Sequence, residues 1–470
     1  MLVVHDAMDR LGFACHDSRM KTQIISLFVL FVLAMLSPLP GAAGKPNIIL
    51  IMADDLGYEA IAANGGESAK TPNLDRLAAE GMRFTNAFAN PLCTPSRVKI
   101  MTGLYNVRNY TRFGELDRGQ ITFAHQLKQV GYATGICGKW QLGKEPDAPQ
   151  HFGFDDALLW QHTGYRHRQV GSEKKIDTRY VNPCLQHNGE DQLFDNGEYG
   201  PQLMTDFACQ FIAEHKDSPF LLYYPMILTH CPFDPTPDST DWDPRRPGST
   251  TYKGDLNDPQ RYFVDMVQYA DKIVGQIVAQ LEQSGIRDNT LILFTGDNGT
   301  DKPIVTPWNG QMIPGGKKTM TDAGTRVPLI VNWPAGITQP GTVTDALMDF
   351  ADVLPTVCDV AGAPLPDDYP GDGKSLVPLF EGRPDARNKE YVYIWHGGEV
   401  IIRNQKYMLL ANKDGSDARL QRYAGAYDGE EVSSPSESEQ VIMDRFQGIL
   451  ESMGKTRRSA IGEGNKGATK

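Results

Sequence analysis

The feature that most constrains the fold is an apolar run, Asn47–Ala53, which ends in two adjacent aspartates. A run without polar alternation is typical of a strand covered on both faces, as in parallel sheets. Similar runs occur at Tyr132–Cys137, Phe220–Tyr224 and Leu291–Thr295, each followed by polar or charged residues. Because parallel strands end at one rim of their sheet, these polar groups are expected to gather there. The pattern predicts an α/β fold, with a large mixed, mostly parallel sheet sandwiched by helices.

Helical periodicity fills the intervals between these strands. Apolar residues recur at helical spacing over 73–80, 122–130 and 260–284, and each segment is followed by a glycine. Residues 151–200 and 232–258 are rich in Gly, Pro, Asn and Asp, which predicts long loops. Long loops over a compact domain are frequent sites of substrate recognition.

The pattern changes beyond about Arg383. Three short alternating segments follow, Tyr391–Trp395, Val400–Arg403 and Tyr407–Ala411. They predict a small antiparallel sheet. Ser436 and Glu439 have the spacing of a capping box, which would open a helix that runs to Met453. We therefore expect a small C-terminal α+β subdomain, followed by a flexible tail.

The N-terminus has the pattern of a secretory signal. An apolar run, Ile24–Leu36, follows Lys21 and precedes a segment of small residues that ends at Gly44. The run is too short to span a bilayer comfortably and is typical of a signal-peptide core. Met20 would be a natural start, with residues 1–19 lying upstream of it. The pattern predicts a secreted or periplasmic protein that is not an integral membrane protein after cleavage, and an uncleaved anchor is the alternative.

The net charge and the cysteines limit the expected partners and the expected disulfides. The formal net charge of −12 argues against nucleic acid as a partner but leaves room for a local cationic site. The chain has seven cysteines. Cys15 would leave with the signal peptide, and the others lack metal-binding spacing. One disulfide is possible in an exported protein, but the sequence does not show which two cysteines would form it.

The segment Cys93-Thr94-Pro95-Ser96-Arg97 predicts a reactive site at the start of a short helix that ends at Gly103. A helix N-terminus favours anions and lowers the pKa of a thiol. The guanidinium of Arg97, one turn further on, suits oxyanions. The segment therefore reads as a nucleophile in an anion site, although an isolated cysteine is more often a half-buried structural thiol.

Four further residues predict a metal site at the expected rim. Asp54 and Asp55 follow the first strand, and Asp297 and Asn298 follow the strand at Leu291–Thr295. These side chains offer hard oxygen ligands, which favour Ca²⁺ or Mg²⁺ over Zn²⁺ or copper. Taken singly, each pair is more often an ordinary turn.

The combination of these motifs over residues 46–334 resembles the formylglycine-dependent sulfatases of the alkaline phosphatase superfamily. The resemblance implies that a maturation enzyme oxidises Cys93 to formylglycine. It implies that Asp54, Asp55, Asp297 and Asn298, together with the modified Cys93, bind calcium, with Mg²⁺ as the alternative. It also implies a sulfatase catalytic domain at 45–383, after upstream residues and a signal peptide at 1–44 and before the small subdomain and tail at 384–470.

The resemblance also assigns roles to the cationic residues. Arg97, Lys139 and Lys317 match positions that neutralise the sulfate group, and His230 and Lys317 would flank the leaving oxygen. One hydroxyl of the hydrated aldehyde would attack sulfur, and the other would later expel sulfate. Lys317 lies in a G-G-K block that continues with Asp322 and Ala323, where the family has Glu and Gly.

One departure from the family concerns Gln141, which stands in Gly-Lys-Trp-Gln-Leu-Gly where a histidine is usual. Glutamine cannot take up a proton near neutral pH, so we expect sulfate release to limit turnover unless Asp55 or water relays the proton. Candidate recognition residues, each more often ordinary surface, are His162, Arg166, His167, Arg168, Trp308 and Trp395.

The sequence thus predicts an exported sulfatase that hydrolyses O-sulfate esters, with sulfated carbohydrate as the expected substrate. Two alternatives stay open. One is a phosphonate or phosphate-ester hydrolase on the same scaffold. The other is a degenerate sulfatase that binds sulfated glycans without turning them over, which only Gln141 favours.

Overall fold

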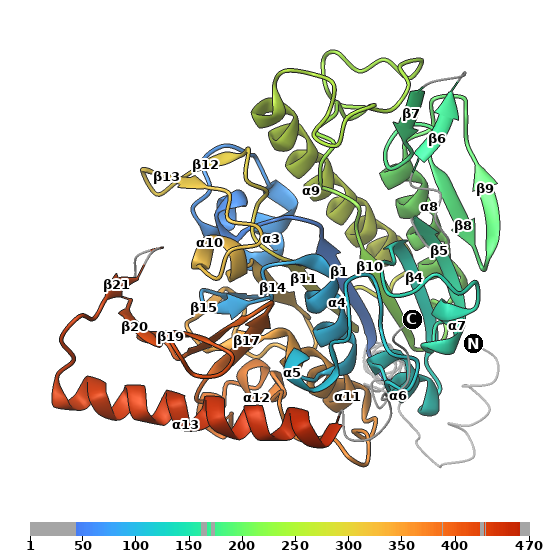
Figure 1. Ribbon diagram of the computed structural model, residues 1–470. Coiled ribbons are helices and arrows are strands. Elements are labelled where there is room, and N and C mark those ends of the chain that lie inside the picture. The colour runs from blue at the N-terminus through green and yellow to red at the C-terminus, as the bar shows by residue number, and fades with distance from the viewer. Residues whose placement is uncertain are drawn as a thin grey trace, which may run out of the picture. The chain divides into compact units, whose positions relative to one another are not determined.

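The computed structural model describes residues 44–160, 167–170, 174–387, 389–423, 427 and 429–460. A ten-stranded sheet has the order β15-β2-β14-β11-β1-β10-β4-β5-β8-β9 (Figure 1). Its strands are β1 (Asn47–Ala53), β2 (Met82–Phe84), β4 (Ala133–Lys139), β5 (Asp156–Trp160), β8 (Cys184–His187), β9 (Glu190–Leu193), β10 (Phe220–Pro225), β11 (Thr290–Gly296), β14 (Leu329–Asn332) and β15 (Thr342–Thr344). The four strands expected from the apolar runs are neighbours and pair in parallel, which confirms the predicted α/β class.

Side chains of β1 alternate between two hydrophobic cores, which explains why its sequence shows no polar alternation. Ile49 and Ile51 face a core formed with α3 (Pro72–Ala79), α8 (Gly200–Glu214) and α9 (Pro259–Gln283). Ile48 and Leu50 face the other core. That second core is built with α4 (Cys93–Thr102), α6 (Phe123–Gln129), α11 (Val353–Ala361) and α12 (Val377–Phe380). The sheet is therefore sandwiched by helices, as predicted.

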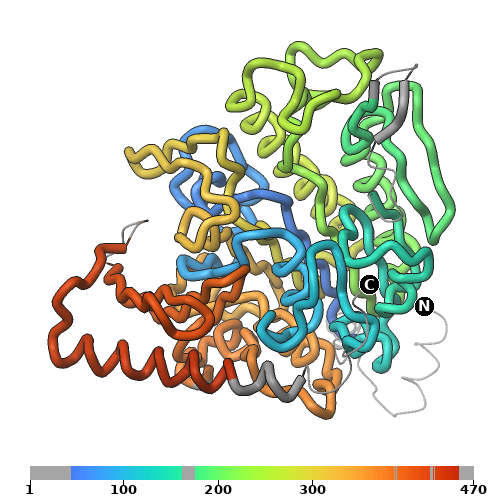
Figure 2. The backbone as a smooth tube through the Cα atoms, in the orientation of Figure 1, coloured from blue at the N-terminus to red at the C-terminus, as the bar shows by residue number. Residues whose placement is uncertain are grey.

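The expectation of a loop over residues 151–200 is wrong. This segment contains β5, β8 and β9, which extend the main sheet, and the hairpin of β6 (His167–Val170) and β7 (Lys174–Asp177). The strands are short and separated by Gly, Pro and Asn, so the turn residues dominate the local sequence pattern and favour a loop. By contrast, residues 232–258 contain no helix or strand, as predicted, and form the yellow-green loops ahead of α9 (Figure 2).

The C-terminal segment forms a separate antiparallel sheet. Its strands are β17 (Val392–His396), β18 (Glu399–Arg403), β19 (Tyr407–Asn412), β20 (Arg419–Arg422) and β21 (Glu430–Glu431), and α13 (Glu437–Ala460) follows. The predicted capping box is present, because Ser436 N donates to Glu439 Oε2 (2.9 Å) and Glu439 N donates to Ser436 Oγ (3.4 Å). The helix continues past Met453, its predicted end, and packs on the sheet through Phe446 and Leu450.

Shorter elements complete the described chain: η1 (Tyr58–Ala60), η2 (Ala62–Asn64), β3 (Ala87–Phe88), α5 (Asn106–Asn109), α7 (Ala148–His151), β12 (Val305–Trp308), β13 (Gln311–Pro314), α10 (Asp322–Thr325), β16 (Met348–Asp349), η3 (Phe350–Asp352) and η4 (Pro384–Ala386). Within the described ranges, no helix has the length and apolar character needed to cross a membrane. The predicted signal segment and the end of the tail lie outside the described residues. The domain boundary after residue 383 stays a prediction.

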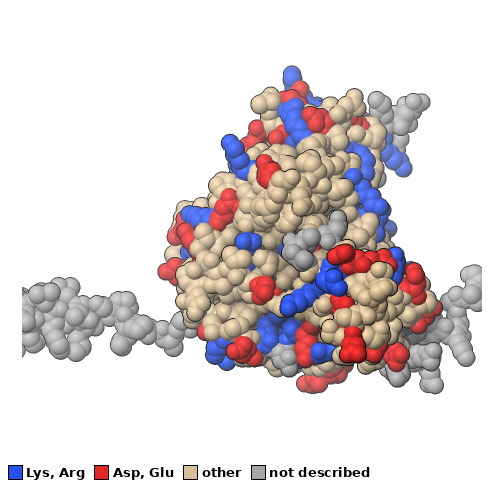
Figure 3. Space-filling view, turned by 90° about the vertical axis from the view of Figure 1, so that its left-hand side faces the viewer, with Lys and Arg blue, Asp and Glu red and all other residues tan. Residues whose placement is uncertain are grey.

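Acidic and basic side chains are interspersed over the face drawn in Figure 3. Over this face, the mixture of signs sets up no large field of one sign. A charged ligand is therefore best recognised by a local set of charges, and the carboxyl rim of the main sheet provides one.

Candidate active site

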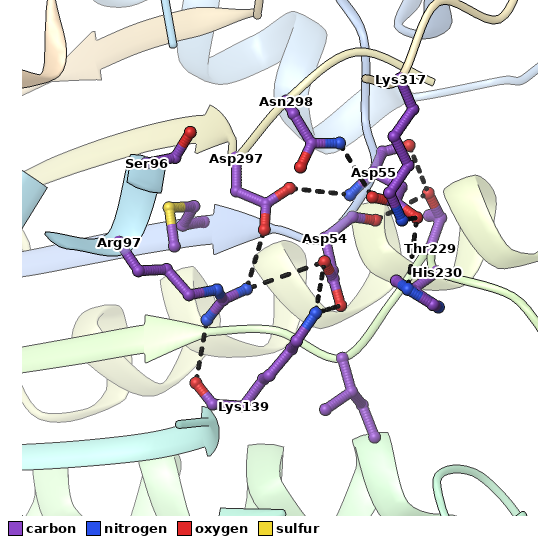
Figure 4. A network of polar contacts seen from close by, with 12 residues as sticks. Asp54, Asp55, Ser96, Arg97, Lys139, Thr229, His230, Asp297, Asn298 and Lys317 are labelled. Carbon is purple, nitrogen blue, oxygen red and sulfur yellow. Dashed lines mark hydrogen bonds and ion pairs between the residues drawn. The ribbon is translucent and has the colours of Figure 1, made fainter. Parts of the chain in front are cut away.

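Residues from several distant segments meet beyond the carboxyl ends of the parallel strands (Figure 4). Asp54 and Asp55 directly follow β1, while Asp297 and Asn298 directly follow β11. Lys139 is the last residue of β4, and His230 lies in the loop after β10. Lys317 comes from the segment after β13, and α4 brings Arg97. Strand adjacency thus gathers the residues that the sequence motifs single out.

Two glycines permit this close approach. Gly138, just before Lys139, has φ of +127°, and a Cβ there would lie 2.0 Å from Pro225 O of β10. A Cβ on Gly299, just after Asn298, would lie 1.8 Å from Ala323 O. Any larger residue at either position would push the chain away from its neighbour, so each glycine holds a motif in place.

Arg97 links three parts of the site. Its Nη1 donates to Lys139 O at 2.9 Å, and its Nη2 donates to Asp297 Oδ2 at 3.0 Å. The same Nη2 lies 3.8 Å from Asp54 Oδ1. The side chain is 1% exposed, so its orientation is set by these partners rather than by water. A guanidinium held in this way presents a fixed positive charge to an anion.

The two lysines each pair with one of the adjacent aspartates. Lys139 Nζ donates to both carboxylate oxygens of Asp54, at 3.0 and 2.7 Å. Lys317 Nζ donates to Asp55 Oδ2 at 2.5 Å, and His230 Nε2 lies 3.6 Å from the same oxygen. His230 and Lys317 therefore lie on one side of the site, around Asp55, and Lys139 and Arg97 lie around Asp54.

Burial and neighbouring charges shift the pKa values of the three site carboxyls in different directions. Burial opposes ionisation of Asp54, but Lys139 and Arg97 hold its pKa below the usual range. Burial raises the pKa of Asp55 despite Lys317. Burial and the nearby Asp54 together raise the pKa of Asp297 to about 7. The neighbouring cations therefore do not fully offset the cost of burying the charged forms of Asp55 and Asp297.

The donor set fits a hard divalent cation. Asn298 Nδ2 donates to Asp55 Oδ1 at 2.8 Å, while Asn298 Oδ1 is buried and has no hydrogen-bond partner. Asp55 N donates to Asp297 Oδ1 at 3.0 Å, which fixes that carboxylate beside the other two. Oxygen atoms of Asp54 and Asp55 also lie within 4.8 Å of a His230 ring nitrogen. Carboxylate and amide oxygens in this number suit Ca²⁺ or Mg²⁺.

Cys93 is the first residue of α4, and Gly103 ends that helix in a left-handed conformation, as predicted. Residues of the signature secure the turn before the helix: Ser96 Oγ accepts from Asn90 N at 3.0 Å and donates to Asn90 O at 3.1 Å. The expectation that this thiol ionises readily is wrong. Burial raises the pKa of Cys93, and Lys139 only partly offsets it.

Gln141, which stands where the family has histidine, also has an unusual backbone conformation. It has φ of +55° and is half-buried, and its Oε1 is buried without a hydrogen-bond partner. An amide oxygen can accept a hydrogen bond, but it cannot remove a proton near neutral pH.

Of the candidate recognition residues, the two tryptophans lie in cores and do not join the site. Trp308 is buried between Tyr58 and Tyr427 and donates from Nε1 to Asn64 O at 2.7 Å. Trp395 is buried in the core between the C-terminal sheet and α13. Both are core residues rather than surface ones. His162 and Arg166 lie outside the described residues, and for His167 and Arg168 only the backbone is described.

Sequence reasoning missed three residues that contact the site. Thr229 Oγ1 donates to Asp54 O at 3.3 Å and to Asp55 O at 3.4 Å, and its N donates to Asp54 O at 2.7 Å. Arg179 contacts His230 Nδ1 and Cys231 O, and its guanidinium lies 4.3 Å from the Trp160 ring centroid. Tyr252 OH lies 3.4 Å from His230 Nε2. None of the three belongs to a periodic pattern or a motif that a single sequence reveals.

The cysteines do not form disulfides among the described residues. Cys93, Cys137, Cys184, Cys209, Cys231 and Cys358 are all free thiols. The disulfide that the sequence left open is therefore absent from this part of the chain.

The fold and the site are those of a hydrolase of oxyanion esters, with Cys93 at a helix N-terminus beside buried carboxylates and cations. A family model described as Sulfatase matches residues 46–363. Human arylsulfatase A is 34% identical over 400 residues, which cover 78% of this chain and 74% of the relative. N-acetylgalactosamine-6-sulfatase of Mus musculus is 33% identical over 386 residues, covering 75% and 69%.

A solved structure gives the same result. That of Ps i-CgsB in complex with k-i-k-neocarrahexaose superposes with a TM-score of 0.72 at 25% identity, covering 89% of this chain and 94% of the other. The chain therefore belongs to the sulfatase family, in the alkaline phosphatase superfamily, and is a sulfuric ester hydrolase.

Proposed function

We propose that this sulfatase is exported and hydrolyses O-sulfate esters on sulfated carbohydrate, through a formylglycine made from Cys93 and a bound divalent cation. The observation that supports it best is the meeting of Cys93, Arg97, Lys139, His230 and Lys317 with the buried carboxylates. Support for a sugar substrate comes from relatives, one named N-acetylgalactosamine-6-sulfatase and one solved with k-i-k-neocarrahexaose.

The cation would be held by Asp54, Asp55, Asp297 and Asn298, with the modified Cys93 beside them, and Ca²⁺ is preferred to Mg²⁺. Such a cation supplies Lewis-acid stabilisation of negative charge on oxygen. Formylglycine supplies a nucleophilic hydroxyl that a thiol lacks. It would be made by a maturation enzyme that acts on the Cys93 segment before folding is complete.

The chain's own residues would bind and orient the sulfate group. Arg97, anchored on Asp297 and Lys139 O, and Lys139, anchored on Asp54, present positive charge from one side. Lys317 and His230 present N–H groups from the side of Asp55, where they would donate to the leaving oxygen. All four side chains are buried, so the charges of Arg97, Lys139 and Lys317 act with little screening by water. Burial and the neighbouring Arg179 lower the pKa of His230, which would therefore donate as a neutral imidazole.

Gln141 is proposed to make sulfate release the slow step. We expect a pre-steady-state burst of released alcohol, close to one equivalent, followed by slower turnover. Gln141→His should remove the burst and raise the steady-state rate about tenfold or more, because a positioned base then assists release. Gln150→His, an exposed change, should leave both phases unaltered. Stopped-flow measurement with 4-nitrophenyl sulfate decides this, and a wild type without a burst would contradict it.

The proposed function is tested first by peptide mass spectrometry across Cys93 in protein from its native host. A mass about 18 Da below the cysteine form marks the conversion of CH₂SH to CHO. Turnover is then screened on sulfated glycans. An unmodified thiol in active, exported protein would refute the proposed nucleophile.

The same preparation separates the two remaining alternatives. Faster cleavage of 4-nitrophenyl phosphate than of the matched sulfate would favour a phosphate or phosphonate ester hydrolase. Tight retention of sulfated glycans without release of sulfate would favour a degenerate binding protein. The complete set of paired cations and carboxylates argues against the second.

A further inference from the structure

An exposed tyrosine lies directly beside the buried site. Tyr252 belongs to the loop segment 232–258, and 48% of its surface is exposed. The side chains that it adjoins are buried, since His230 is 5% exposed and Lys317 is 3% exposed. Figure 4 shows His230 and Lys317 on the same side of Asp55. An apolar ring at the edge of a charged, buried cluster is a surface that water solvates poorly and that a ligand can cover.

The geometry places Tyr252 on the side of His230 that faces the site. His230 Nδ1 is directed toward Arg179 and Cys231 O, away from Asp55. His230 Nε2 is directed toward Asp55 Oδ2 at 3.6 Å and the Tyr252 hydroxyl at 3.4 Å. The two rings meet edge to face, with centroids 5.8 Å apart and planes at 85°. Any group that receives a hydrogen bond from Nε2 therefore lies next to Tyr252.

The loop holds this ring in a defined position. Lys253, the next residue, pairs with the buried Asp301. Phe233 N donates to Lys253 O at 3.1 Å. Asp255 accepts from Thr250 N at 2.7 Å and from Thr251 N at 2.9 Å, which closes the turn around Tyr252. The backbone on both flanks of Tyr252 is thus anchored, and Lys253 Nζ lies over the ring, 5.2 Å from its centroid. A side chain restrained in this way loses little further entropy when a ligand covers the rest of its ring.

We propose that Tyr252 is a specificity residue, whose ring packs against the six-membered ring of the leaving alcohol. This rests on the proposed function, because it takes the Nε2 side of His230 as the side of the leaving oxygen. The sulfate group would occupy the buried cations, and the adjoining ring would extend over Tyr252. Aromatic side chains favour flat, partly apolar rings, and pyranose and aryl rings share that chemistry.

The test compares substrates and competitors with and without a ring. Tyr252→Ala should raise KM for 4-nitrophenyl sulfate about tenfold and change kcat less than threefold. Tyr252→Phe keeps the ring and should leave KM within about twofold of wild type. Inhibition constants for inorganic sulfate and ethyl sulfate, which have no ring, should stay unchanged in both variants. Val441→Ala, which trims an exposed side chain on α13, is the control for apolar surface loss.

The outcomes separate this proposal from the proposed function. An unchanged KM in Tyr252→Ala, or a parallel weakening of inorganic sulfate, overturns the role of Tyr252. If Tyr252→Ala raises KM more for the sulfated saccharide found in the glycan screen than for the aryl ester, the ring of Tyr252 recognises a sugar. If KM rises equally for both substrates, the ring accepts pyranose and aryl rings alike. If the wild type cleaves no sulfate ester, the proposed function fails. Equilibrium binding of phenyl sulfate to wild type and Tyr252→Ala then decides the role of Tyr252.

Discussion

Cys93→Ala is expected to lower kcat/KM for sulfate esters by at least about 10⁴-fold, to the background rate. The change removes the only side chain that can become the proposed nucleophile. The fold should survive, because alanine is a good helix former and Cys93 begins α4 rather than filling a large core position. Turnover of 4-nitrophenyl sulfate, measured with matured wild type and variant side by side, gives the ratio.

Cys209→Ala is the matched control, since Cys209 is a half-buried free thiol on α8 whose Sγ donates to Gln276 O of the neighbouring helix α9. It should retain wild-type activity. Inorganic sulfate should still bind to Cys93→Ala, because Arg97, Lys139 and Lys317 keep their carboxylate partners. Activity above about one per cent of wild type in Cys93→Ala would show that another group is the nucleophile.

Asp297→Asn is expected to lower kcat/KM about 10²- to 10³-fold and to abolish stabilisation by calcium. Asp297 accepts from Arg97 and from Asp55 N, so its carboxylate orients the guanidinium as well as offering an oxygen to the cation. Loss of its charge should weaken both functions. In wild type, calcium at a hundred times its dissociation constant should add about 2.7 kcal/mol to the free energy of unfolding.

The measurement is thermal unfolding of chelator-treated protein with and without added CaCl₂ or MgCl₂, together with bound-metal analysis. Asp156→Asn is the control, because Asp156 begins β5 at the opposite rim of the same sheet and pairs with His187. It should keep the calcium-dependent rise in melting temperature. A calcium-dependent rise of wild-type size in Asp297→Asn would place the cation elsewhere.

The parallel core of the fold could be predicted because its signals are local. Asn47–Ala53 and Leu291–Thr295 are nearly continuous apolar runs, and the strands that contain them, β1 and β11, pair along their full length. Glycine and capping signals placed both ends of α4 and the start of α13 at the predicted residues, whereas α13 runs on to Ala460, past its predicted end at Met453. The strands within residues 151–200 were missed, since β8 and β9 are short and polar and gain their stability from neighbouring strands.

For the site, the identities of the main residues could be predicted, but their environment could not. Motifs at strand ends identified Asp54, Asp55, Lys139, Asp297 and Asn298, because a parallel sheet brings such ends to one rim wherever the chain goes between them. The environment of those residues was not predictable. That Cys93 is buried deeply enough for its thiol pKa to rise depends on packing from other segments.

The sequence by itself determined the parallel core of the sheet, its rim and the identities of the charged groups placed there. Only the tertiary structure decided which loop residues join them: Arg179 and Tyr252 meet His230 across 51 and 22 residues of chain, and Trp308 and Trp395 pack into cores instead. The physical reason is that strands and helix ends are set by interactions between near neighbours. The position of a loop side chain is set by contacts with segments far along the chain, which no local pattern records.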